Sequence, residues 1–365
     1  MTKAKENAGS KEGRTRDKSL DAVKGFAIVL VMFGHCIVKN DMVDPVKDPY
    51  VYDVIKAIEM PLFIMISGYL AGLSKRKDSL KEAAYTIRKR AVSYLVPFFV
   101  WLFLSNLISG QFAPLQALKD VLFHLDWGLW FLMTLFLITV LVLLAECFPK
   151  TWQSAAFLLT AYILFFLQSR SGNTFLSPHL TVRYMPYYLV GFLVSRYVFP
   201  LKNNGNKWIL LLTKKKVLWG LWGISLFGFV WLIVRYDMVT VHSTKELLCQ
   251  MTASLLGSYL CFFGIYRFYE ARKVPEDFAK NVQLSKPPFL AQVGLYTLEI
   301  YVLHFRFVRM LGFYKRGYSL YSLEGIGVVL ASFLVMSVLT WLIIVLVKKV
   351  PFLDFLLFGK SRPRR

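Results

Sequence analysis

The sequence predicts an all-α fold, a polytopic bundle of about ten transmembrane helices with both termini in the cytoplasm. Hydrophobic residues make up 56% of the 365 residues and charged residues only 18%, and the mean hydropathy is +0.50. This composition is too apolar for a soluble domain of such length. Apolar runs recur along the whole chain, and each is long enough to cross the roughly 30 Å of hydrocarbon in a bilayer.

The predicted spans leave no room for a separate soluble domain. We expect residues 1–19 to form a disordered, basic cytoplasmic tail, residues 20–350 the transmembrane domain, and residues 351–365 a basic cytoplasmic C-terminal tail. The first apolar run lacks a small-residue cleavage site, so we interpret it as an uncleaved span rather than a signal peptide. The ten spans are placed near residues 20–38, 52–73, 91–109, 127–147, 153–169, 182–200, 217–234, 247–268, 289–307 and 323–347.

The distribution of positive charge orients these spans. With the N-terminus inside, the inner segments hold 31 of the 44 Lys and Arg residues and the outer segments hold 11. Cytoplasmic loops of membrane proteins carry such an excess, so the net charge of +22 reflects topology, and we expect no nucleic acid partner. All five histidines then fall at or beyond the external surface, where we expect any proton chemistry: His35, His124, His179, His242 and His304.

The first span carries two ionisable residues, Lys24 and His35. Ionisable groups inside an apolar segment are costly, by roughly 2.5–3.5 kcal/mol even on lenient scales, which makes each a functional hypothesis. Eleven helical steps of about 100° return to nearly the same face after a rise of roughly 16 Å. One helix face therefore carries a cation near the inner surface and an imidazole near the outer one. The structural alternatives are a topology-determining lysine and a helix-end histidine that reaches water.

The second span contains Glu59 beside Pro61. Proline removes a backbone donor, so we expect a kink or break in this helix, which membranes tolerate beside neighbouring helices or a water-filled cavity. Glu59 would lie at a depth similar to that of His35, and a carboxylate beside an imidazole suits a general base with an orienting partner. The alternatives are that Glu59 pairs with Lys56 or that it borders a solvated loop.

A basic cluster precedes the third span. It comprises Lys75-Arg76-Lys77 and Arg88-Lys89-Arg90. Clustered guanidinium and ammonium groups at a cytoplasmic mouth can hold the phosphates of a nucleotide-containing donor. The alternative for each residue is contact with anionic lipid.

The remaining chemistry-bearing residues form no recognisable metal or phosphate motif. The four cysteines, Cys36, Cys147, Cys249 and Cys261, have no paired or metal-like spacing, so we expect packing roles and no metal site. There is no glycine-rich phosphate loop and no repeat of fixed period.

Five segments in order resemble acyltransferase family 3, the integral membrane proteins that include polysaccharide O-acetyltransferases and fucose acetylase-like proteins. The first resembles the family's opening pattern of a basic residue, ten intervening positions and a histidine. The resemblance extends from residue 20 to about residue 305. Its segments are Leu20-Asp21-Ala22-Val23-Lys24-Gly25 through Gly34-His35, Met60-Pro61-Leu62-Phe63 with Ser67-Gly68-Tyr69, Leu129-Trp130-Phe131-Leu132, Tyr188-Leu189-Val190-Gly191-Phe192, and Ile300-Tyr301-Val302-Leu303-His304.

The resemblance implies transfer of an acyl group, usually acetyl from cytoplasmic acetyl-CoA, to a hydroxyl of a sugar or glycan at the membrane or beyond it. It implies an essential role for His35, with Lys24 as its companion. Family members often carry paired arginines early in the third helix. Here Arg88 and Arg90 are nearby, but Ser93 and Tyr94 occupy the region where the second arginine is expected.

We therefore predict a membrane O-acyltransferase in a bacterial cytoplasmic membrane. His35, oriented by Glu59, would act as general base, and Lys24, Arg88 and Arg90 would hold the acyl-CoA phosphates. Tyr301 and His304, from the last motif, are candidates for binding substrate. The alternatives are a transporter or flippase for a glycan or lipid-linked sugar, and a non-catalytic membrane partner in polysaccharide assembly.

Overall fold

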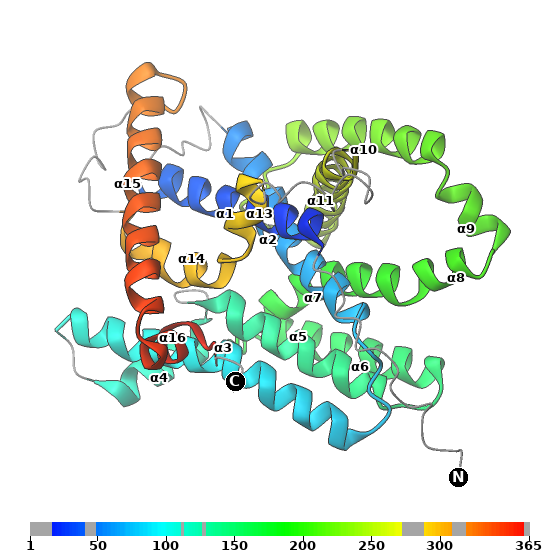
Figure 1. Cartoon of the computed structure of the whole chain (residues 1–365), viewed down its shortest axis with the longest axis horizontal. Coiled ribbons are helices and arrows are strands. Elements are labelled where there is room, and N and C mark those ends of the chain that lie inside the picture. Colours follow the sequence, from blue (N-terminus) through cyan, green and yellow to red (C-terminus); the bar gives the residue numbers. More distant parts are fainter. Residues whose placement is uncertain are drawn as a thin grey trace, which may run out of the picture.

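The structure is a computed structural model in which residues 17–40, 49–110, 113–125, 129–271, 288–308 and 319–360 are described. The predicted tails at residues 1–16 and 361–365 lie outside the described residues. Within those ranges the chain is helical and has no strand. In chain order the helices are α1 (Lys18–Lys39), α2 (Pro49–Gly72), α3 (Leu80–Ile108), α4 (Pro114–Phe123), α5 (Trp130–Glu146), α6 (Thr151–Arg170), α7 (Pro178–Leu193), η2 (Val194–Val198), α8 (Phe199–Asn203), α9 (Lys207–Leu212), α10 (Lys215–Arg235), α11 (Thr244–Ala271), α13 (Phe289–Gly294), α14 (Thr297–Leu303), η3 (His304–Arg306), α15 (Leu323–Lys348) and α16 (Pro351–Phe358) (Figure 1).

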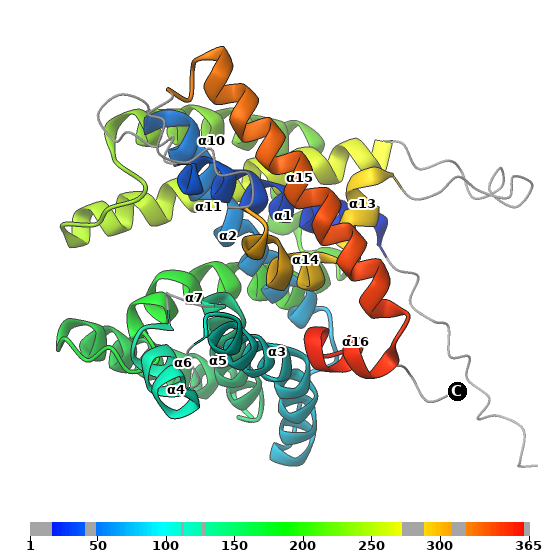
Figure 2. The same ribbon diagram turned by 90° about the vertical axis from the view of Figure 1, so that its left-hand side faces the viewer.

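The helices form two groups joined by α2 (Figures 1 and 2). In one group α1 packs against α11, α13 and α15, and α10 packs against α11. In the other group α3, α5, α6 and α7 pack side by side. Helix α2 contacts α1 and α11 on one side and α7 on the other. Residues on α1 and α2 therefore lie where both groups can contribute to one site.

Two close helix crossings explain glycines in the sequence motifs. A Cβ atom at Gly68 of α2 would lie 2.0 Å from the carbonyl oxygen of Tyr188, and one at Gly191 of α7 would lie 2.0 Å from that of Met65. The crossing of α1 and α13 is equally close, since a Cβ atom at Gly25 would lie 1.9 Å from the carbonyl oxygen of Leu290. Small residues permit such approach of membrane helices.

The all-α membrane prediction is confirmed, although several helices differ from the predicted spans. Seven described helices are long and apolar enough to cross a membrane, and α5 is a shorter apolar helix. Helix α2 continues through Pro61, so the expected break is absent, although proline removes one backbone donor there. The ninth predicted span, residues 289–307, is instead divided into α13, α14 and η3, with a turn at Leu295 and Tyr296.

The C-terminal segment differs from the expected tail. Residues 351–358 form α16, which begins with Pro351 at a position that suits proline and ends at Gly359. Helix α16 packs on α3, and Phe358 is fully buried. Its apolar run is too short to be a span, so the sequence pattern alone did not separate it from a tail.

Candidate active site

A cavity of about 310 Å³ lies where α1, α2, α3, α4 and the start of α5 meet α14 and η3. It brings together four of the predicted site residues from three distant parts of the chain. Its apolar lining includes Val31, Met60, Phe98 and Leu102. Its polar and ionisable lining residues are His35, Lys56, Glu59, Ser105, Asp120, His124, Tyr301, His304 and Arg306.

His35 and His304 face each other across a short distance. Their ring centroids are 5.2 Å apart with planes inclined by 39°, and the ring of Phe305 lies 5.2 Å from that of His35. His35 is on α1, as predicted, about one turn before that helix ends at Lys39. His304 follows α14 directly, in the short helix η3. A break in the ninth span therefore presents the second histidine to the first.

The protein selects one tautomer of His304. Its Nδ1 lies 2.8 Å from the carbonyl oxygen of Ile300, which can only accept, so Nδ1 carries the proton. The Nε2 atom is then an acceptor. It is buried and has no hydrogen-bond partner in the described part of the chain. His304 thus has an unused lone pair beside a cavity that it lines, which suits contact with a hydroxyl group.

Glu59 lines the same cavity as His35 but pairs with a different residue. Its Oε1 accepts a hydrogen bond from Lys56 Nζ at 3.2 Å. Its Oε2 packs against Gly34, where an added Cβ atom would lie 3.0 Å away. No hydrogen bond joins Glu59 to His35 among the described residues. The structure therefore brings the two predicted residues into one cavity, and Lys56, a cation inside the same span, is the direct partner of Glu59.

Tyr301 is on α14, and its side chain reaches the start of α5. Its hydroxyl oxygen accepts a hydrogen bond from the backbone N–H of Phe131 at 3.4 Å. This N–H belongs to the first turn of α5, where backbone donors have no partner within the helix. Because the Tyr301 oxygen accepts this bond, its own proton remains to be donated elsewhere. The hydroxyl is thus a buried donor at the cavity wall.

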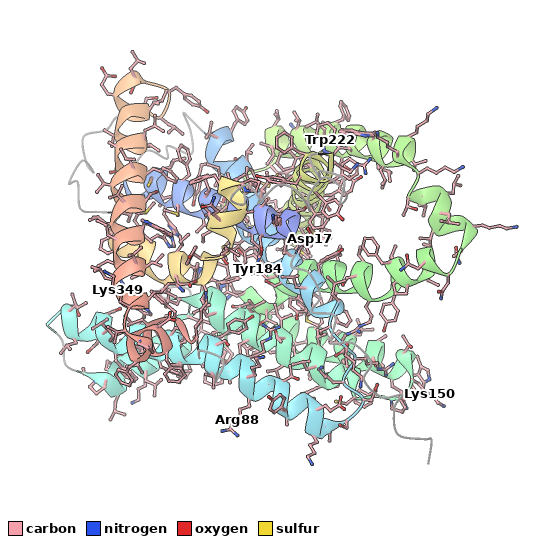
Figure 3. The ribbon with its side chains drawn as sticks, viewed as in Figure 1. Asp17, Arg88, Lys150, Tyr184, Trp222 and Lys349 are labelled. Atoms are coloured by element: carbon pink, nitrogen blue, oxygen red, sulfur yellow. The ribbon has the colours of Figure 1, made fainter. Side chains whose placement is uncertain are left out.

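Aromatic side chains form much of the remaining wall. Trp130 stacks on Tyr184 with centroids 5.0 Å apart, and Tyr184 lies near the centre of the molecule (Figure 3). The guanidinium of Arg306 lies 5.5 Å from the ring of Trp101. Trp101 and Arg306 were not among the residues predicted from the sequence, and Lys56 was expected only as a partner of Glu59. The only available signal was position, since Arg306 follows His304 closely and Lys56 precedes Glu59 by one helical turn.

A second, basic pocket of about 710 Å³ lies at the start of α3 and the loop before it. It includes Arg90, one of the predicted donor-binding residues, whereas Arg88 does not line it. Arg88 is exposed and points away from the bundle (Figure 3). The basic residues that line this pocket are Lys75, Lys77, Lys81, Lys89 and Arg90.

Two arginines fix the loop that lines the basic pocket. Arg76 donates to the carbonyl oxygens of Glu146 and Phe148, so it anchors the loop to the end of α5. Arg196 donates to the carbonyl oxygen of Ser74 at 2.7 Å and pairs with the carboxylate of Glu146. It lies in the π-helical turn η2, a feature frequent at functional sites.

Lys24 lies apart from both pockets. It is on α1 with His35, as predicted, but forms an ion pair with Asp21 at 2.6 Å, one turn earlier on the same helix. It lines neither the cavity nor the basic pocket. In the described ranges, no group of three or more His, Cys, Asp and Glu side chains is arranged to hold a metal ion.

Comparisons with known proteins agree on one family. The family model described as "Acyltransferase domain" matches residues 17–346. The chain is 28% identical over 257 residues to Nodulation protein NolL of Sinorhizobium fredii, a match that covers 66% of this chain and 66% of that protein. It is 26% identical over 311 residues to Nodulation protein NolL of Mesorhizobium japonicum, covering 78% of this chain and 77% of that protein.

No solved structure matches this chain. The family match covers most of the predicted transmembrane domain and every segment on which the resemblance was based. It includes His35, Glu59, Tyr301 and His304, the four residues that the fold brings to the cavity. The chain therefore belongs to acyltransferase family 3 and is an integral membrane O-acyltransferase.

Proposed function

We propose that the protein transfers an acetyl group from acetyl-CoA to a hydroxyl of a sugar or surface glycan in a bacterial cytoplasmic membrane. The observation that carries this proposal is the cavity in which His35, His304 and Tyr301 converge. Acyl transfer to a hydroxyl needs a base for the hydroxyl proton and a donor for the developing oxyanion. Two imidazoles and a buried phenol supply these groups.

The chemical step balances without any redox partner. His35 takes the proton of the acceptor hydroxyl as the oxygen attacks the thioester carbonyl carbon. The carbon–oxygen bond forms, the carbon–sulfur bond of the tetrahedral intermediate breaks, and the proton passes from His35 to the departing thiolate. The products are an acetyl ester and free CoA, and His35 returns to its neutral form. An imidazole suits this role because its ordinary pKa lies near neutrality.

Tyr301 and His304 bind the reacting groups in this proposal. The Tyr301 hydroxyl accepts from Phe131 and donates its proton to the carbonyl oxygen of the thioester, where negative charge develops. In this tautomer of His304 the Nε2 atom is an acceptor, and it receives a hydrogen bond from a hydroxyl of the sugar. Glu59 neutralises the charge of Lys56 in an ion pair. The pair therefore leaves no uncompensated charge in the cavity that His35 lines.

The basic pocket is the proposed site for the donor phosphates. Its five cations include Arg90, and nucleotide phosphates are held well by clustered Lys and Arg. We propose that this pocket faces the cytoplasm, in agreement with the positive-inside distribution. Lys24, although already paired with Asp21, and Arg88 are further candidates for phosphate contact. An extended pantetheine arm would then connect the pocket to the cavity.

The cavity wall suits a sugar acceptor. Trp101, Trp130 and Phe305 present aromatic surface beside Asp120 and His124. Pockets that combine aromatic walls with a few polar groups are typical of small-molecule sites. We propose that the sugar lies against these rings, with the hydroxyl to be acylated between His35 and His304.

An assay with labelled acetyl-CoA distinguishes the proposed enzyme from its alternatives. Purified protein in detergent is incubated with the label and a panel of glycans, and proteoliposomes are tested in parallel for movement of the same glycans. Label recovered on a glycan supports the proposal. Movement of glycan without acylation favours a transporter or flippase. The absence of both activities favours a non-catalytic partner. Either of these two results contradicts the proposal.

A further inference from the structure

A buried carboxylate links the short helix α14 to the C-terminal end of the chain. Glu299 of α14 is fully buried, and its Oε1 lies 2.9 Å from Lys348 Nζ at the end of α15. The same oxygen accepts a hydrogen bond from Lys360, just after α16. A buried carboxylate is costly unless it is paired. The ion pairs with these two lysines therefore stabilise the buried position of the Glu299 carboxylate.

The position of Glu299 makes this pairing relevant to the cavity. Helix α14 runs only from Thr297 to Leu303, and it carries Tyr301 and leads into His304. A helix of seven residues has little stability of its own, so tertiary contacts decide its orientation. Glu299 is thus an anchor on the same short helix as two of the residues that face the cavity.

A second contact joins the C-terminal segment to the cavity wall. The indole N–H of Trp101 donates to the carbonyl oxygen of Leu357 at 3.0 Å, and Trp101 lines the cavity. Gly359 ends α16 with φ +65°, and a Cβ atom there would lie 2.5 Å from the carbonyl oxygen of Ser93. The end of α16 is therefore fitted closely against α3, one residue before Lys360.

We infer that residues 351–360, which lie beyond the family match, complete the acyl-transfer site as positioning residues. Lys360, with Lys348, holds Glu299 and so aligns Tyr301 and His304 with His35, while Leu357 holds Trp101. None of these C-terminal groups touches the reacting atoms. The inference rests on the proposed function, because it assigns these residues to the same cavity.

Lys360→Met tests the inference. Its side chain is 39% exposed, so removal of its charge leaves the core intact. Lys349→Met is the matched control, since Lys349 is exposed and directly follows Lys348 at the end of α15 (Figure 3). We expect Lys360→Met to lower kcat by about tenfold with the KM for acetyl-CoA unchanged, because small misplacements of catalytic groups are costly. Lys360→Arg should restore most of the activity.

Hydrogen exchange supplies a readout that does not depend on activity. The peptide covering residues 296–304 should exchange faster in Lys360→Met than in the wild type or Lys349→Met. In a Glu299→Gln background, Lys360→Met should cost little further activity, because the two changes remove one interaction.

An unchanged kcat overturns the inference, and so does a reduced kcat without faster exchange in this peptide. Faster exchange with full activity overturns it as well, because Lys360 would then anchor α14 without affecting the site. Wild-type protein that transfers no acetyl group to any glycan contradicts the proposed function instead.

Discussion

The imidazole rings of His35 and His304 lie 5.2 Å apart, although they come from opposite ends of the chain. The two rings are tilted relative to each other, and they belong to different helices, α1 and η3. Each ring is therefore positioned by its own helix. His304 has its Nδ1 proton committed to Ile300, which leaves a single acceptor nitrogen. We therefore expect different roles for the two histidines, a base for His35 and a hydrogen-bond acceptor for His304, and each role can be tested by its own variant.

His304→Ala should lower kcat by about 10²-fold, because it removes the acceptor that aligns the substrate hydroxyl for attack. The KM for acetyl-CoA should stay within about twofold of the wild type, since the donor phosphates bind elsewhere. Steady-state kinetics on the purified protein measure both quantities. His242→Ala, a change in the loop after α10, is the control and should match the wild type. A donor KM that rises with an unchanged kcat would contradict the assignment.

Tyr301→Phe should reduce kcat by about 10- to 100-fold, since it removes one donor to the developing oxyanion. The ring remains, so its edge contact with Phe131 is kept. Tyr296→Phe is a suitable comparison, because Tyr296 packs on Trp341 outside the cavity. The prediction is wrong if both variants lose activity equally, as that would indicate a shared effect on packing.

Lys56→Met should destabilise the protein by about 3 kcal/mol, because it leaves the buried Glu59 without its counter-charge. The double variant Lys56→Met with Glu59→Gln should recover part of that stability, since no unpaired charge remains. Thermal unfolding in detergent measures the difference, with Lys245→Met as an exposed control. Additive losses in the double variant would show that the two side chains do not act as a pair.

Arg90→Ala should raise the KM for acetyl-CoA by about tenfold with little change in kcat, because it removes a charged contact to the donor phosphates. The wild-type KM should also rise with ionic strength, since exposed charges are screened by salt. Arg88→Ala tests the outward-pointing neighbour and should have the smaller effect. Arg235→Ala, at the end of α10, is the control; an Arg90→Ala KM equal to this control would exclude the basic pocket as the donor site.

The sequence was most informative where local pattern decides structure. Apolar runs predicted an all-helical membrane protein, and the spacing of Lys24 and His35 requires only one continuous helix, which α1 supplies. Glu59 could be expected near His35 from their similar depth in successive spans, whereas Tyr301 and His304 could be expected there only through the family resemblance. Contacts between distant segments have no periodic signal.

The differences arise where tertiary contacts decide the outcome. Where the ninth span is divided, Gly294 lies close to the backbone of Asp21, a tertiary contact that hydropathy does not report. The structure has the pair of Lys56 and Glu59 that the sequence offered as an alternative, because residues three apart are adjacent on a helix. Helix α16 packs against α3, and it is too short to be predicted as a membrane span from hydropathy.

The most direct test of acyl transfer at this cavity is the rate at which His35→Ala moves label from acetyl-CoA to an acceptor glycan. We expect at least a 10²-fold loss relative to the wild type, because general base catalysis commonly contributes that much. The variant should insert, purify and bind acetyl-CoA as the wild type does, and His242→Ala should retain full activity. Label transfer by His35→Ala at the wild-type rate would contradict the account.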